Sequence, residues 1–183
     1  MIQIGLNLLG LSIAAGTLAA IVWSIAHPSR RIWPPDRYTA LTPIFVWVPT
    51  LTLFGILIVL GLMGWGDFPI SDWVRFGIGL PLILIGNVAV WTEVFYFGIP
   101  LTSGAVGDLR TDGLYRYSRN PQYIADIAIL TGWALLSASL IALPASVGGI
   151  IVLLVAPLAE EKWLETQYGE AYRKYKTTVR RYF

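Results

Sequence analysis

Two short stretches of this chain carry side chains that can bind a small molecule. The first precedes an apolar segment, where the unpaired N–H groups of a helix N-terminus attract an anion. Arginine and asparagine donors there can hold a carboxylate, and tyrosine rings can stack on a purine or a cation. The second is an acidic pair that can bind hydroxyl or ammonium groups. The residues are Tyr115, Tyr117, Arg119, Asn120, Pro121 and Tyr123 in the first stretch, and Glu160 and Glu161 in the second.

Both stretches also have a simpler interpretation. Basic and aromatic residues are common at the headgroup level of any membrane protein. Carboxylates at the end of a membrane span need water or a partner. If Glu160 and Glu161 pair with Arg116 or Arg119, they tie the loop to the tail and close a cup over the mouth of the protein.

The composition excludes several kinds of active site. The chain has no cysteine, so it has no thiolate nucleophile, disulfide or cysteine-based metal site. Its one histidine, His27, lies beside Pro28 in a basic loop, so Ser-His-Asp catalysis and histidine-rich metal sites lack their parts. We therefore expect no metal site. We also expect no nucleic-acid partner.

Long apolar segments must position these residues. The chain has 183 residues, of which 56% are hydrophobic and 13% are charged, whereas soluble domains have about 25% charged residues. A helix needs roughly 20 apolar residues to cross a membrane, and segments 4–26, 43–64 and 74–95 qualify. Residues 124–159 are almost wholly apolar but are interrupted at 137–144, which indicates two short helices. The alternative is one tilted span with a re-entrant piece.

The basic residues favour five spans over four. Every Lys and Arg except Arg75 follows the first span, follows the third span or belongs to the tail. With five spans, all of these lie on one side, which the positive-inside rule identifies as the cytoplasm. The chain is therefore predicted to be an all-α integral membrane bundle of five transmembrane helices, with a C-terminal helical hairpin. The N-terminus would lie outside, and the C-terminus and the polar stretches would be cytoplasmic.

The tail and two acids in the spans add further candidates. Aromatic and apolar side chains recur at helical spacing from Tyr168 to Val179, which predicts a short amphipathic helix at the membrane interface. We expect it to cover the cup. Glu93 and Asp126 lie within predicted spans, so each is either functional or extends to the nearby interface.

The two polar stretches together resemble one enzyme family. The pattern is Gly113-x-Tyr115-x-x-x-Arg119-Asn120-Pro121-x-Tyr123, then an apolar hairpin, then Glu160-Glu161-x-x-Leu164-x-x-x-Tyr168-Gly169-x-x-Tyr172-x-x-Tyr175. It is similar to the isoprenylcysteine carboxyl methyltransferase and phospholipid N-methyltransferase superfamily of membrane enzymes. The likeness covers about residues 101–183.

The resemblance implies S-adenosylmethionine as the cofactor, S-adenosylhomocysteine as its product, and a lipophilic substrate that enters from the bilayer. In this single membrane domain, residues 1–97 would form three spans, and residues 98–183 would form the cofactor loop, the hairpin and the tail. Glu161 and Arg119 would serve catalysis. The cofactor contacts would be Gly113, Leu114, Tyr115, Asn120, Pro121, Tyr123, Glu160 and Glu161.

Methyl transfer suits the residues available, because it is a displacement that needs alignment and exclusion of water, with no metal. Two positions depart from the family. Asn120 stands where eukaryotic members have histidine, and an amide cannot titrate near neutrality. Ala156 stands where the carboxyl methyltransferases have an arginine suited to a substrate carboxylate. Amine, thiol and other lipophilic acceptors therefore stay open alongside a carboxyl group.

Two other functions remain compatible with the sequence. Sterol reductases and steroid 5α-reductases look similar in this C-terminal region and use a nicotinamide cofactor. The phosphates of NADPH need several basic groups, and Arg116, Arg119, Arg173 and Lys174 can serve. The third reading is a lipid-binding or scaffold protein without activity.

Overall fold

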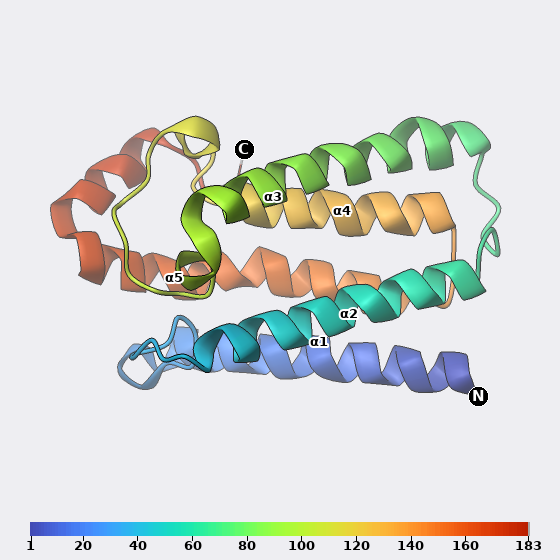
Figure 1. Ribbon diagram of the computed structural model, residues 1–183, viewed down its shortest axis with the longest axis horizontal. Helices are drawn as coiled ribbons and strands as arrows, with labels where there is room; N and C mark the ends of the chain where they lie inside the picture. The colour runs from blue at the N-terminus through green and yellow to red at the C-terminus, as the bar shows by residue number, and fades with distance from the viewer. Residues whose placement is uncertain (183) are drawn as a thin grey trace.

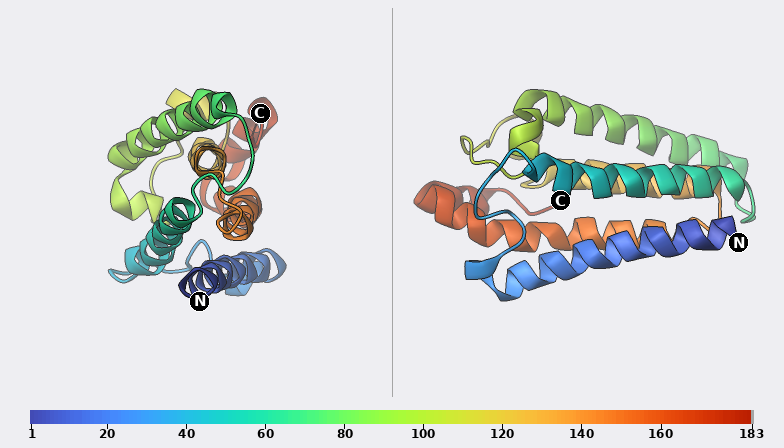
Figure 2. Two further views of the ribbon diagram at one scale, coloured as in Figure 1. Left: turned by 90° about the vertical axis from the view of Figure 1, so that its right-hand side faces the viewer. Right: turned by 60° about the horizontal axis from the view of Figure 1, so that its bottom comes forward.

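The chain folds into a helical bundle, with no β-strand among residues 1–182, the part that this computed structural model describes. Short segments η1 (Pro28–Arg30), the π-helix η2 (Trp73–Gly79) and η3 (Gly113–Arg116) lie between the long helices. Figures 1 and 2 show the long helices side by side, which confirms the predicted all-α bundle. The long helices are α1 (Ile2–Ala26), α2 (Thr42–Met63), α3 (Leu80–Thr102), α4 (Pro121–Ser137) and α5 (Leu143–Thr178).

The helices have the length and surface of membrane spans. Helices α1, α2 and α5, and η2 joined to α3, are each long and apolar enough to cross a membrane. Helix α4 has 17 residues, or roughly 25 Å at the rise of an α-helix, and it packs along α3. Large apolar side chains cover the outside: Phe45 is 75% exposed, Ile85 69% and Phe95 82%, as a lipid-facing surface requires. The chain is a multi-pass integral membrane protein.

The predicted interruption in residues 124–159 separates α4 from α5. Helix α4 ends at Ser137 because Ala138 adopts a left-handed conformation, with φ of 47°, and Pro144 occupies an early position in α5. The Gly66 N–H donates to the Ser137 carbonyl, which joins the α2–α3 loop to the α4–α5 connection. Two antiparallel helices, and no re-entrant piece, therefore occupy this segment.

Glycines bring α4 close to α3 and η2. A Cβ atom on Gly86 would lie 2.7 Å from the backbone oxygen of Ala125, and one on Gly132 would lie 2.6 Å from the backbone oxygen of Gly79. Only a residue without a side chain fits at these positions, as at many helix contacts in membranes. This packing fixes where α3 ends and α4 begins, and so it fixes the ends of the polar loop between them.

Helix α5 bends after the acidic pair. At Gly169 the backbone has φ of 54° and ψ of −125°, which glycine adopts without the strain that a Cβ would bring. Beyond the bend the helix turns back toward the α3–α4 loop (Figure 1). Tyr172 and Tyr175 are buried, and the Tyr175 hydroxyl donates to the carbonyl oxygen of Tyr115. The aromatic face predicted for the C-terminal helix therefore covers this loop.

The loops that carry the basic residues lie at one end of the bundle. In Figure 1 the α1–α2 loop, the α3–α4 loop and the bent end of α5 are together at the left, and the N-terminus and the α2–α3 loop are at the right. The left end, called the polar end below, contains every Lys and Arg except Arg75. The charge asymmetry read from the sequence is thus present in the fold.

Candidate active site

The two polar stretches predicted to converge meet at the polar end. The Nη2 atom of Arg119 lies 2.9 Å from Oε1 of Glu161. The Tyr123 hydroxyl donates to Oε1 of Glu160. The loop before α4 and the acidic pair of α5 therefore form one site, in which each glutamate has its own set of partners.

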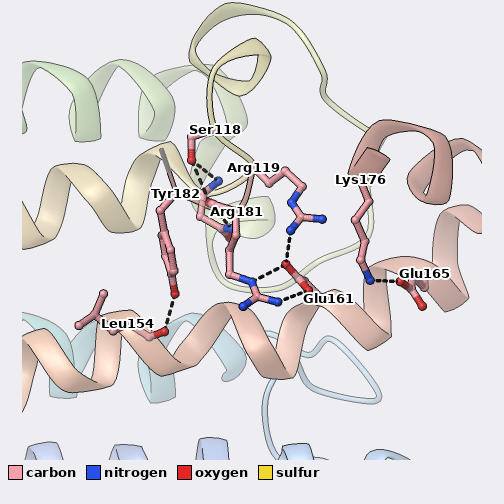
Figure 3. Close-up of polar contacts among 9 residues, drawn as sticks. Ser118, Arg119, Leu154, Glu161, Glu165, Lys176, Arg181 and Tyr182 are labelled. Atoms are coloured by element: carbon pink, nitrogen blue, oxygen red, sulfur yellow. Dashed lines mark hydrogen bonds and ion pairs between the residues drawn. The ribbon is translucent and has the colours of Figure 1, made fainter. Parts of the chain in front are cut away.

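Glu161 is the centre of the first half of the site. Besides Arg119, it accepts two hydrogen bonds from Arg181, whose Nε and Nη2 atoms each lie 2.8 Å from a carboxylate oxygen. Both guanidinium groups point toward Glu161 in Figure 3. The side chains of Arg119 and Glu161 are 7% and 9% exposed. A carboxylate so far from water is stable only with such partners, and this pairing holds the pKa of the Arg181 guanidinium above its usual range.

The backbone of the tail completes this half. The Asn120 side-chain amide and the Ser118 hydroxyl both donate to the carbonyl oxygen of Arg181, each at 3.0 Å. The backbone N–H of Arg119 donates to the Arg180 carbonyl at 2.9 Å. Asn120 thus contributes a hydrogen bond from its amide. This contact does not require a side chain that titrates. Sequence analysis did not place Arg181 in the site.

Arg119 keeps hydrogen-bonding capacity that the chain does not use. Its Nε and Nη1 atoms are buried and have no hydrogen-bond partner among the described residues. Buried donors are almost always paired in folded proteins, because an unpaired one loses its bonds to water. The unused N–H groups therefore mark a place for an acceptor from outside the chain, such as an oxygen of a carboxylate or a phosphate.

Glu160 forms the second half of the site. Its Oε1 atom accepts a hydrogen bond from Trp33 Nε1 at 2.8 Å and another from the hydroxyl of Tyr123. Trp33 belongs to the α1–α2 loop, so this half joins three separate parts of the chain. The sequence predicted Glu160 and Tyr123 but gave no signal for Trp33.

The loop residues predicted as cofactor contacts lie around this core but not all within it. Gly113 has φ of 55°, and a Cβ there would lie 2.8 Å from Arg110 Nη2. Tyr115 contacts the tail through its carbonyl oxygen, and burial raises the pKa of its hydroxyl. Pro121 begins α4. Leu114 and Pro121 face an apolar cavity.

The acid inside α3 has a partner of its own. Glu93 is 1% exposed and forms an ion pair with Arg110, whose guanidinium also lies over the ring of Tyr96, 3.7 Å from its centroid. Glu93 therefore does not extend to the interface for water. Asp126 of α4 is partly exposed and has no hydrogen bond or ion pair with the residues that the structure describes.

An apolar cavity leads from the bundle surface to the loop. It has a volume of about 280 Å³ and lies between α3 and α4. Ile85, on the lipid-facing surface, forms one wall, and Ser118 and Pro121 lie at the polar end. Its lining suits a hydrocarbon chain.

Ala156 lies in buried, apolar surroundings. Ala156 is 3% exposed and packs with Ile21 and Ala159, and the ring of Tyr123 contacts this cluster. The donors nearest to this cluster, Trp33 and Tyr123, already bind Glu160. Among residues 1–182, no three His, Cys, Asp or Glu side chains are grouped so as to hold a metal ion.

Comparison with known proteins gives two matches and one negative result. The family model described as phospholipid methyltransferase matches residues 74–171. The steroid 5-alpha-reductase DET2 of Solanum lycopersicum is 31% identical over 108 residues, which are 58% of this chain. The matched region spans 42% of the length of that reductase. No solved structure matches the chain.

Proposed function

Because the chain belongs to the phospholipid methyltransferase family, we propose that it transfers a methyl group from S-adenosylmethionine to a lipophilic substrate in the membrane. The observation that carries the proposal is that the buried Nε and Nη1 atoms of Arg119 have no hydrogen-bond partner among the described residues. They suit the carboxylate of the methionine part of that cofactor.

The bound cofactor would supply an electrophilic methyl group on a sulfonium, which reacts by in-line displacement. The chain's own residues bind and orient the cofactor and the substrate, and they exclude water. Arg119 holds the cofactor carboxylate. Glu161 is a positioning residue, because both of its oxygens already accept hydrogen bonds from guanidinium groups. It fixes the orientation of the Arg119 guanidinium.

The second half of the site faces the rest of the cofactor. Glu160, held by Tyr123 and Trp33, presents an acceptor edge for hydroxyl or ammonium groups. The loop residues Gly113, Leu114 and Tyr115 would line this side of the cofactor, and the bent end of α5 covers Tyr115 through Tyr175. The tail and the loop together keep water from the site. Asn120 and Pro121 hold the start of α4 in place.

The substrate reaches the site through the bundle side. Its hydrocarbon part lies in the apolar cavity between α3 and α4, with its reactive group near Ser118 and Pro121. Because Ala156 is packed among apolar residues, an amine or thiol acceptor is favoured over a carboxylate. The same positive-inside argument assigns the polar end to the cytoplasm and the N-terminus to the outside.

A second candidate function is an NADPH-dependent reductase. The 31% identity with a steroid 5-alpha-reductase favours it, and the free N–H groups of Arg119 would also suit a phosphate. The two functions differ in the cofactor that the same arginine binds. A protein that only binds lipid would bind neither cofactor.

Calorimetric titration of the purified protein with S-adenosylhomocysteine and, separately, with NADPH tests the proposal. We expect binding of the first and none of the second. Arg119→Lys keeps a positive charge for Glu161 but loses the Nε and Nη1 donors, and should weaken S-adenosylhomocysteine binding by about tenfold or more, the loss of one charge-assisted bond. Tyr123→Phe should also weaken binding.

Arg116→Lys is the matched control, because Arg116 is exposed, its guanidinium lies over Tyr117, and it forms no ion pair with Glu161. It should leave the affinity within about twofold. Binding of NADPH alone would replace the methyltransferase by the reductase. If the purified protein is folded, as a cooperative unfolding transition shows, and binds neither cofactor, both enzyme functions are rejected.

A further inference from the structure

A second cavity lies beside α5. It has a volume of about 410 Å³ and is bounded by the end of α1, by η1 and by α5 on both sides of its bend. Ala159, Lys162, Trp163 and Thr166 line it at spacings that place them on one side of the helix. None of the predicted cofactor contacts lines this cavity.

Three basic side chains face the cavity from different segments. They are Arg31 of the α1–α2 loop, Lys162 before the bend of α5 and Arg173 after it. Lys162 is exposed and has no ion pair or hydrogen bond from its side chain to the described residues. Glu165, the acid in the lining, is already paired with Lys176. The unpaired charge in the cavity is therefore positive.

The carboxylate partners of the two arginines are weakly held. Arg31 contacts Asp36 at 2.8 Å, and Arg173 contacts Glu170 at 2.9 Å. The side chains of Asp36 and Glu170 are 53% and 83% exposed, and ion pairs so open to water contribute little. An anion in the cavity can therefore replace both carboxylates, while Arg31 keeps the hydrogen bond from its Nε to the carbonyl oxygen of Pro34.

We propose that this cavity binds the phosphate group of an anionic phospholipid. Arginine forks match phosphate oxygens, and lysine adds a compact positive charge. Basic pockets between transmembrane helices at a membrane face bind lipid head groups by the same chemistry.

The surroundings of the cavity favour a lipid over a soluble phosphate. The cavity lies where α1 ends, beside Trp23, which is 45% exposed and stacks on His27 at 3.9 Å between ring centroids. Exposed tryptophan at the end of a span marks the headgroup level. Val22 on the same helix is 51% exposed. A lipid whose phosphate lies in the cavity can place its acyl chains along this apolar surface.

Native mass spectrometry of the protein in a neutral detergent tests the assignment. Phosphatidylglycerol and phosphatidylcholine are titrated separately, and the bound fraction is measured. We expect tighter binding of phosphatidylglycerol. The double variant Lys162→Gln/Arg173→Gln should weaken that binding by about tenfold to thirtyfold, the effect of two basic groups at a membrane surface.

The matched control is Arg30→Gln/Lys174→Gln, which removes the same charge from exposed neighbours outside the lining. It should change the affinity by less than about threefold. Equal losses in the two double variants would overturn the site, and so would equal affinity for the two lipids. If glycerol 3-phosphate displaces bound lipid at the concentration at which phosphatidylglycerol binds, the occupant is a soluble phosphate and the lipid assignment is wrong. None of these readouts depends on methyl transfer.

Discussion

Replacing Glu161 by glutamine should destabilise the polar end, because two arginines share this one negative charge. Glutamine has nearly the same shape, so the change removes the negative charge and leaves the packing intact. Arg119 would then be a buried cation without a counter-charge, with its side chain only 7% exposed. Arg181 would lose the same partner, but its side chain is 36% exposed and regains water.

The burial of the two arginines sets the size of the effect. Breaking a buried ion pair by removing one partner costs about 3–5 kcal/mol. The glutamine oxygen can still accept one hydrogen bond from Arg119, which favours the lower end of that range. The exposed Arg181 adds at most about 1 kcal/mol. We therefore expect Glu161→Gln to lower the free energy of unfolding by about 3–4 kcal/mol.

Equilibrium unfolding of the purified protein in mixed micelles measures this loss. Glu165→Gln is the control, because the Glu165–Lys176 pair is 35% and 39% exposed and should contribute about 1 kcal/mol or less. The double variant Glu161→Gln/Arg119→Gln should be no less stable than Glu161→Gln alone, since the uncompensated charge is gone. A loss below about 1 kcal/mol for Glu161→Gln, or additive losses in the double variant, would refute the reasoning.

Two further predictions concern the bundle and its orientation. Gly132→Ala should destabilise the protein by about 2 kcal/mol or more, because its Cβ would lie 2.6 Å from a backbone oxygen of η2. Equilibrium unfolding measures this loss, with Gly16→Ala as the control because a Cβ on Gly16 would contact nothing within 4 Å. Equal stability of the two variants would contradict the close contact. Because the chain has no cysteine, Ser29→Cys and Ser71→Cys each place a single thiol, at opposite ends of the bundle. A membrane-impermeant maleimide added to intact cells should label only the Ser71→Cys variant. Labelling of only the Ser29→Cys variant would show the opposite orientation.

Much of the fold follows from hydropathy. The apolar segments predicted at 4–26, 43–64 and 74–95 correspond to α1, α2 and the run from η2 into α3, and the interruption in 137–144 separates α4 from α5. The helix ends are less well predicted, because charged residues can continue a helix beyond the membrane. Helix α5 therefore runs on to Thr178, although its apolar part ends before Glu160.

The site was predictable where a motif was local. Arg119 and Tyr123 were expected to meet the acidic pair, and they do. Trp33 was missed because 127 positions separate it from Glu160, and only the packing of α1 on α5 brings them together. Arg181 was missed because its position depends on the bend at Gly169, which no charge pattern reveals.

The two adjacent glutamates of α5 also restrain that helix mechanically. Neighbouring residues project about 100° apart around a helix axis, and Glu160 and Glu161 hold different segments, the α1–α2 loop through Trp33 and the tail through Arg181. If α5 rotates about its own axis, both attachments must stretch together. The α1–α2 loop and the tail therefore both oppose a rotation of α5 at the site.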